Sequence, residues 1–120
     1  MNNSLTLTNG TSIEVANEDY SSEKIQNGEH NKLNIKDGWR LPSINELDLI
    51  FQKIHQTGNG NFRNDWYWSN ESFQVSWDWE VKIGYNFEDG STNAKALVSG
   101  SISHGLSEAY VRLVRNLRAN

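Results

Sequence analysis

Residues 42–58 have the sequence PSINELDLIFQKIHQTG, and this stretch carries the clearest structural signal in the chain. Ser43 is followed three residues later by Glu46, which is the spacing of a capping box at the start of a helix. The apolar residues then recur at helical spacing and form one stripe, made of Leu47, Ile50, Phe51 and Ile54. Gly58 follows as a residue suited to the left-handed conformation that ends many helices. The spacing predicts a helix over residues 44–55 that packs this stripe against a sheet.

A second regular pattern lies in residues 73–87, which read FQVSWDWEVKIGYNF, with an apolar side chain at every odd position. Strict alternation is typical of a strand with one buried face. The run is longer than an ordinary strand, so we expect a bend or bulge near Gly84. The alternation places Trp77 and Trp79 on the face of the aliphatic residues that follow, and therefore predicts both in the core.

The amino-terminal part contains short apolar bursts on either side of Asn9-Gly10, a dipeptide typical of tight hairpin turns. We therefore expect a short hairpin at the start of the chain. Residues 17–36 are polar and have no clear period, which predicts a loop with at most one turn of helix.

The carboxyl-terminal part is expected to complete a sheet. A turn at residues 88–91 precedes an expected strand at 94–98 and a loop at 100–105. The last expected strand, 110–114, has apolar residues on both faces, which favours a central position. One principal helix on a twisted antiparallel sheet makes the fold class α+β.

The composition fits one small globular domain over residues 1–120, with 36% hydrophobic and 11% aromatic residues and no cysteine. Without cysteine the chain cannot form disulfides or use a thiol nucleophile. Residues 1–8 have no basic or apolar run of the kind found in a signal peptide, and no stretch is long enough to span a membrane. We therefore expect a cytoplasmic protein, or one that acts in the host cytoplasm if it is phage-encoded.

The net charge of −4 makes nucleic acid an unlikely partner, because phosphate binding needs several clustered cations. The charge lies in residues 1–31, where Lys24 is the sole basic residue among five acidic ones. The local exception is a carboxyl-terminal group of arginines, which we interpret as a solvated end of the chain: Arg112, Arg115 and Arg118.

Four motifs occur in order along residues 38–115. They are Gly38-Trp39-Arg40-Leu41-Pro42-Ser43, Tyr67-Trp68-Ser69, Trp79-Glu80-Val81 ahead of Asp89-Gly90, and Tyr110-Val111-Arg112-Leu113-Val114-Arg115. Together they resemble the Lcl-C family, the carboxyl-terminal domain of bacterial collagen-like adhesins, and more distantly the C-type-lectin-like and formylglycine-generating-enzyme-like domains. The resemblance implies a compact domain with a loop-rich face for ligands and roles in adhesion and glycan recognition. In the first motif we expect Arg40 to pair with a buried carbonyl or carboxylate.

The chain also departs from these relatives. It lacks the cysteine pair of the formylglycine-generating enzymes, and its one proline, Pro42, is not in the calcium-binding triplet of calcium-dependent lectins. Two oxygen-bearing pairs, Asn64-Asp65 and Asn70-Glu71, would make an incomplete calcium cage, so we expect no metal and no cofactor. The three histidines have no metal-ligand spacing, and no nucleophile motif is present, so we expect no enzymatic activity.

The aromatic segment Trp66-Tyr67-Trp68 is the best candidate for a ligand platform, because indole and phenol rings stack on sugars. Alternation exposes either Tyr67 or the tryptophan pair, and the resemblance assigns Trp68 to the core. The predicted ligand-binding residues are Arg63, Asn64, Trp66, Tyr67, Asn70 and Glu71.

Two functions follow from these observations. The first is a non-enzymatic module that binds a glycan or another cell-surface ligand, as the resemblance implies. The second is a protein-binding inhibitor encoded by a phage or mobile element and acting in the bacterial cytoplasm, which the small size and the lack of cysteine favour.

Overall fold

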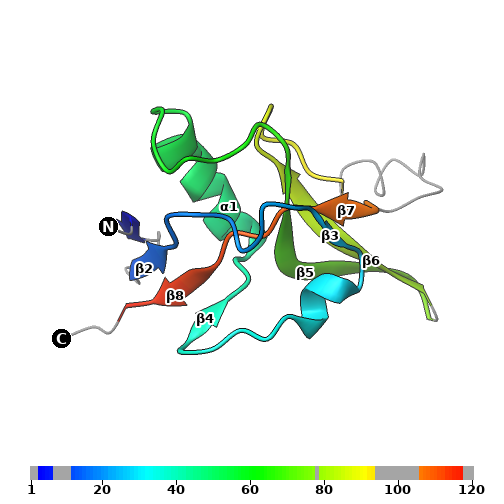
Figure 1. Ribbon diagram of the computed structural model, residues 1–120. Helices are drawn as coiled ribbons and strands as arrows, with labels where there is room; N and C mark the ends of the chain where they lie inside the picture. Colours follow the sequence, from blue (N-terminus) through cyan, green and yellow to red (C-terminus); the bar gives the residue numbers. More distant parts are fainter. Residues whose placement is uncertain (1–2, 7–11, 78, 94–105, 118–120) are drawn as a thin grey trace.

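The computed structural model describes residues 3–6, 12–77, 79–93 and 106–117 (Figure 1). Within this part, one helix packs on antiparallel strands that form three sheets, so the fold class is α+β as predicted. No helix of the described residues is long and apolar enough to cross a bilayer. The expected strand at 94–98, the loop at 100–105, the Asn9-Gly10 turn and Arg118 lie outside the described residues.

The helix confirms the prediction made from residues 42–58. Helix α1 (Ile44–Ile50) continues without a break into one π-helical turn, η2 (Phe51–His55). At its start, Ser43 Oγ accepts the Glu46 N–H at 3.1 Å, and Glu46 Oε1 accepts the Ser43 N–H at 2.8 Å, which completes the capping box. At its end, Gly58 has φ 83°, the left-handed conformation for which a glycine is suited. The stripe of Leu47, Ile50, Phe51 and Ile54 is buried.

The cap gives a direct stability test. Ser43→Ala should lower the free energy of unfolding by about 0.5–2 kcal/mol, because the Glu46 N–H loses its side-chain acceptor at the helix start. Chemical denaturation of the two proteins measures this difference. Ser43→Thr, which keeps a hydroxyl acceptor, is the matched control and should lose much less. Equal losses in both variants would mean that packing at this position, and not the cap, sets the effect.

The largest sheet joins the two ends of the chain. Its order is β1 (Asn3–Thr6), β2 (Ser12–Val15), β8 (Val114–Asn116) and β4 (Trp39–Arg40), and all neighbours are antiparallel. The β1–β2 pair is the expected amino-terminal hairpin.

The last strand is central, as predicted, but begins four residues later than expected. Before β8, the backbone bonds to other segments: Trp68 N–H donates to Tyr110 O, Tyr20 N–H donates to Val111 O, and Ala16 N–H donates to Leu113 O. Because these bonds go to different segments of the chain, residues 110–113 do not form a regular strand. The bonds also bring residues 16–20 close to the carboxyl-terminal segment.

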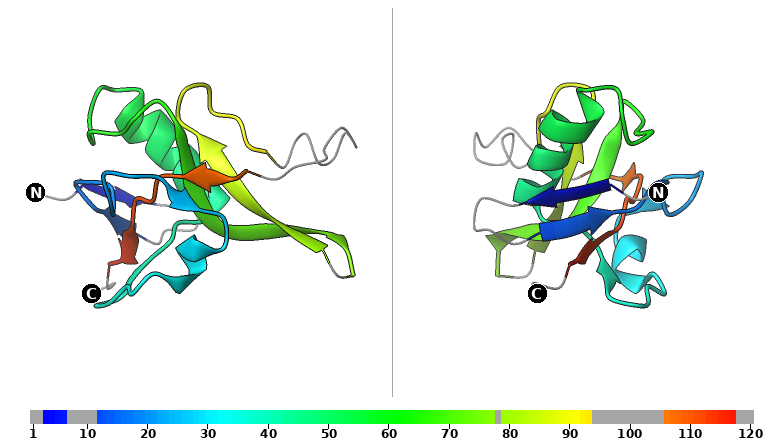
Figure 2. Two further views of the ribbon diagram at one scale, coloured as in Figure 1. Left: turned by 45° about the vertical axis from the view of Figure 1, so that its right-hand side comes forward. Right: turned by 90° about the vertical axis from the view of Figure 1, so that its left-hand side faces the viewer.

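The prediction of one long strand over residues 73–87 is wrong. The chain reverses between Ser76 and Trp79, and the residues form two antiparallel strands, β5 (Trp66–Ser76) and β6 (Trp79–Asn86). Trp77, predicted in the core, lies at the reversal with 92% of its surface exposed. Figure 2 shows the outer part of this hairpin projecting away from the helix and the four-stranded sheet.

The expected irregularity near Gly84 is present, although the extra residues belong to the partner strand. Trp68 pairs with Gly84, but the next regular pair is Ser72 with Lys82, so β5 bulges by two residues. Within β5, the adjacent Tyr67 and Trp68 are both fully buried. Neighbouring strand residues point to opposite faces, so β5 must have a hydrophobic cluster on each side.

The two clusters explain this double burial. Tyr67 packs with the helix stripe and the β2 and β6 residues, in a cluster that includes Phe87 and Val114. Trp68 belongs to the other cluster, with Leu41 and Val111. The strand therefore runs between two cores.

Residues 17–36 are mostly loop, with one short 3-10 helix, η1 (Glu29–Lys32), as expected. A two-residue strand, β3 (Ile25–Gln26), was not expected, and pairs with β7 (Glu108–Ala109). From η1, the buried His30 ring stacks on Trp68, with the ring centroids 4.1 Å apart and the planes 5° from parallel.

His30 predicts a pH dependence. Burial lowers the pKa of His30 below its ordinary value and the positive charge of Lys82 acts in the same direction, while a hydrogen bond with the Gln26 backbone opposes them. Because the folded pKa lies below the unfolded value of about 6.5, the unfolded state binds more protons. The contribution of the neutral His30 to the free energy of unfolding is therefore complete above the unfolded pKa. We expect the free energy of unfolding to fall as the pH drops from about 7 to about 5. His30→Phe keeps a ring on Trp68 but cannot titrate, so its unfolding free energy should fall less over this range. Parallel pH profiles of the two proteins would contradict the assignment.

Candidate functional site

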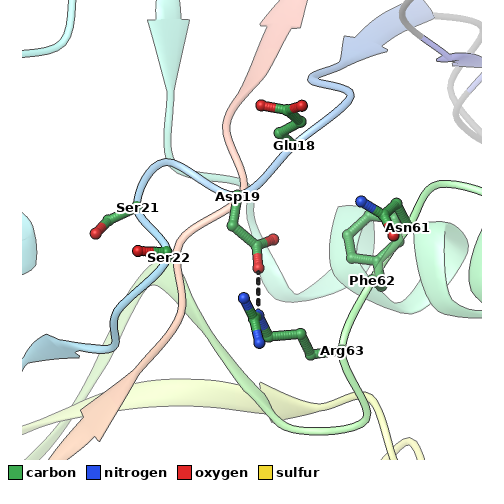
Figure 3. Close-up of a pocket in the computed structure, with 7 residues that line it drawn as sticks. All are labelled: Glu18, Asp19, Ser21, Ser22, Asn61, Phe62 and Arg63. Carbon is green, nitrogen blue, oxygen red and sulfur yellow. Dashed lines mark hydrogen bonds and ion pairs between the residues drawn. The ribbon is translucent and has the colours of Figure 1, made fainter.

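A cleft of about 400 Å³ lies between the segment after β2 and the loop that precedes β5 (Figure 3). The residues that line it are Glu18, Asp19, Ser21, Ser22, Asn61, Phe62 and Arg63. Two segments about 40 positions apart in the sequence thus form opposite walls. Tertiary contacts beneath the cleft hold these walls together.

The Asp19 carboxylate is the centre of these contacts, with 9% of its side chain exposed. Its Oδ1 accepts Arg112 Nε at 3.0 Å and lies 2.9 Å from Arg112 Nη2. Its Oδ2 accepts the Tyr67 hydroxyl at 3.1 Å and Arg63 Nε at 3.3 Å. Both carboxylate oxygens are therefore engaged by groups of the chain itself.

Arg112 is fully buried, so the interpretation of this arginine as part of a solvated end is wrong. Besides Asp19, its guanidinium donates to the carbonyls of Ala16 at 3.0 Å, Gly60 at 2.6 Å and Asn61 at 3.0 Å. Its guanidinium thus makes four hydrogen bonds, and Asp19 offsets its charge. Burial of an arginine is tolerated only with such pairing.

The guanidinium also lies 3.9 Å from the centre of the Phe62 ring, a cation–π contact. Phe62 packs in turn on the main hydrophobic cluster. Arg112 therefore ties both walls of the cleft to the core.

Tyr67 is part of this support and presents no surface to a ligand. Its hydroxyl donates to Asp19 and accepts the Arg63 N–H at 3.0 Å, while its ring is fully buried. Burial raises the pKa of Tyr67 far above its ordinary value, and the Asp19 charge adds to this effect, so the hydroxyl keeps its proton. The expected ring-stacking role of Tyr67 does not fit this position, because β5 has a core on each face.

Arg63 is the cationic residue that lines the cleft, and its side chain is half exposed. Its guanidinium is held by the Asp19 carboxylate and lies 4.7 Å from the centre of the Tyr110 ring, while its backbone N–H donates to the Tyr67 hydroxyl. This anchoring reduces the entropy that the side chain would lose on binding.

The loop that carries Arg63 has the backbone geometry of tight turns. Gly60 has φ 83° and Asn61 has φ 55°, and asparagine is one of the few other residues that tolerate this region. A side chain at Gly60 would bring its Cβ within 2.5 Å of Ile54, so the loop lies directly against the helix end. The Gly-Asn-Gly-Asn sequence over residues 58–61 permits this path.

The other predicted ligand-binding residues lie elsewhere. Asn64 is exposed beside the cleft, with Oδ1 2.7 Å from His55 Nε2. Trp66 is half buried against the second cluster, while Asn70 and Glu71 are exposed on β5. Glu71 Oε2 accepts the Ile44 N–H at 2.6 Å, so this carboxylate caps the start of α1. Arg63 is thus the one member of the predicted set that lines the cleft.

Sequence reasoning missed the acidic wall. This wall, formed by Glu18, Asp19, Ser21 and Ser22, lies in the stretch predicted to be a loop with at most one turn of helix. One signal was present: Arg112 stands between apolar residues in a segment predicted to be central, and a buried arginine needs a carboxylate. The sequence does not say which carboxylate supplies this partner.

A second hollow, of about 500 Å³, lies between β4 and β8. Its two arginines are bound within the chain. Arg40 donates to both Glu46 oxygens, at 2.7 and 2.6 Å, which confirms the expected pairing. Burial alone would raise the pKa of Glu46, but the bonds from Arg40 and Ser43 outweigh it and lower that pKa. Arg115 pairs with Glu14.

Among the described residues, no three His, Cys, Asp or Glu side chains lie close enough together to hold a metal ion.

Comparisons with protein-family models, with curated proteins and with solved structures each found no match to this chain.

Proposed function

We propose that this chain is a non-enzymatic recognition module of the C-type-lectin-like kind, and that the cleft binds a glycan or a similar hydroxyl-rich ligand. The observation that carries the proposal is a polar, open cleft built on a rigid, fully paired support. Asp19 and Arg112 fix the two walls from below, and Arg63 projects from that support into the cleft. A preformed site of this kind loses little entropy on binding.

The lining suits hydroxyl groups. Ser22 offers a hydroxyl, Asn61 an amide, Glu18 a carboxylate and Arg63 a guanidinium, so the lining provides both donors and acceptors. Phe62 adds an apolar part to the lining, with Arg112 and Phe87 packed against its ring.

The resemblance to the Lcl-C family supports the same proposal. Its motif residues perform structural roles here: Arg40 pairs with Glu46, Trp68 fills the second cluster, and Arg112 anchors the cleft. As part of the proposal, we assign to this chain the roles in adhesion and glycan recognition that the Lcl-C resemblance implies.

We propose binding and not catalysis for the cleft, whose described lining combines no serine with a histidine. The serines Ser21 and Ser22 have no histidine in the lining. His30 is buried on Trp68, and His55 bonds to Asn64.

A glycan array followed by calorimetry with each positive sugar tests the proposal. Ser22→Ala and Asn61→Gly remove lining groups, and glycine keeps the positive φ of position 61. Both variants should weaken binding at least fivefold while their melting temperatures stay within a few degrees of the parent. Lys36→Ala, an exposed position outside the lining, is the control and should bind normally. Unchanged affinity in both cleft variants would place the ligand elsewhere.

A specific observation supports the second candidate, a protein-binding inhibitor. Trp77 is 92% exposed at the reversal of a projecting hairpin, and exposed tryptophans often anchor protein interfaces. Trp77→Ala should then abolish binding to a protein partner and leave glycan binding intact. Loss of partner binding in the Ser22→Ala protein alone would instead favour the cleft.

A further inference from the structure

We infer that the ligand of the cleft carries a carboxylate, as an acidic sugar does, and that Arg63 receives it. This inference rests on the proposed function and specifies its ligand class. Three features of the described residues lead to it: the local charge, the orientation of the Arg63 guanidinium, and the position of Glu18.

The charge at the base of the cleft does not balance. Two guanidinium groups, those of Arg63 and Arg112, share the single carboxylate of Asp19. The buried Arg112 makes its closer contacts there, at 2.9 and 3.0 Å, whereas Arg63 approaches at 3.3 Å. Asp19 therefore offsets one of the two guanidinium charges, and the half-exposed Arg63 keeps the remaining charge in the same cleft as the exposed carboxylate of Glu18.

The free edge of Arg63 is positioned for a ligand. Its Nε is occupied by Asp19, and neither terminal amino group has a hydrogen-bond partner among the described residues. Asp19 and the Tyr110 ring, 4.7 Å from the guanidinium, fix the plane of the group. A planar pair of N–H donors matches the two oxygens of a carboxylate, and such paired contacts are stronger than neutral hydrogen bonds.

Glu18 limits how much negative charge the ligand can carry. It lines the same cleft and is exposed, so a second anionic group beside the first would meet its repulsion. Sulfated polyanions and phosphates, with more than one negative charge, suit the site less well than one carboxylate. Ser22 and Asn61 remain available for the hydroxyl groups that accompany it.

Calorimetric or NMR titration with four probes tests this inference: D-glucuronate, D-glucose, acetate and inorganic phosphate. We expect glucuronate to bind at least tenfold more tightly than glucose, and its affinity to fall as sodium chloride is raised. Arg63→Gln should remove the tenfold preference. Arg63→Lys, which keeps the charge but not the paired donors, should retain only part of it. The matched control Lys36→Gln removes an exposed cation outside the cleft and should preserve the full preference.

The outcomes separate this inference from the proposed function. Equal affinity for glucuronate and glucose would overturn the carboxylate and leave glycan binding in place. Equal affinity for acetate and glucuronate, without glucose binding and dependent on Arg63, would support the carboxylate and overturn the hydroxyl-rich ligand. Tighter binding of phosphate than of either acid, or no binding of any probe, would overturn the inference. If the Arg63→Gln protein does not fold, the comparison between Arg63→Lys and the parent decides the same question.

Discussion

Arg112→Met should lower the free energy of unfolding by about 3–5 kcal/mol, the loss expected when one partner of a buried ion pair is removed. The substitution keeps the length of the side chain but leaves the Asp19 carboxylate with weaker partners. It also leaves the carbonyls of Gly60 and Asn61 without their donor. Chemical denaturation at neutral pH measures the loss.

Arg115→Met is the matched control. Arg115 also pairs with a carboxylate, that of Glu14, but its side chain is 37% exposed. Pairs of this exposure contribute about 0–1 kcal/mol, so the control should lose far less than Arg112→Met. Similar losses in the two variants would mean that Arg112 is not buried.

A double-mutant cycle isolates the pair itself. Asp19→Asn and Arg112→Met should each destabilise the protein, and the double variant should lose less than the sum of the two single losses. Additive losses would contradict a direct interaction between these side chains.

Leu47→Ala should lower the free energy of unfolding by about 2–5 kcal/mol, because it leaves a cavity in the main cluster. Leu47 is fully buried and faces the cluster that contains Ile13 and Tyr67. The packing of the helix on the sheets therefore depends on this side chain. The measurement is a denaturant midpoint with an unchanged slope, which shows that stability alone has changed.

Leu49→Ala removes the same atoms from a half-buried position of the same helix, and should cost clearly less than Leu47→Ala. If the two substitutions have the same effect, the stripe does not define the buried face of α1.

Local patterns predicted the elements whose signals are contained in a few consecutive residues. The capping box of Ser43 and Glu46, the helix stripe and the left-handed Gly58 all act within one helix, so their spacing was sufficient. The amino-terminal hairpin followed from its apolar pairs for the same reason.

The alternation over residues 73–87 was real but did not reveal the reversal. The alternation continues past the reversal because β5 shifts register between Gln74 and Ser76, so that Phe73 and Val81, both at odd positions, pair on one face. Residues 77–78 also lack the glycine or asparagine typical of a tight turn. As a result, Trp77 was predicted in the core and is exposed.

The sequence by itself determined the α+β class, the helix with both of its ends and the amino-terminal hairpin. It also predicted Arg63 as a ligand contact, and the structure places this residue in the lining of the cleft. The tertiary structure alone decided that Tyr67 and Arg112 are buried and that residues 18, 19, 21 and 22 line a cleft together with Arg63. The physical reason is the distance along the chain between partners. Arg112 is buried because Asp19, 93 positions away, offsets its charge, and no local pattern encodes that pairing.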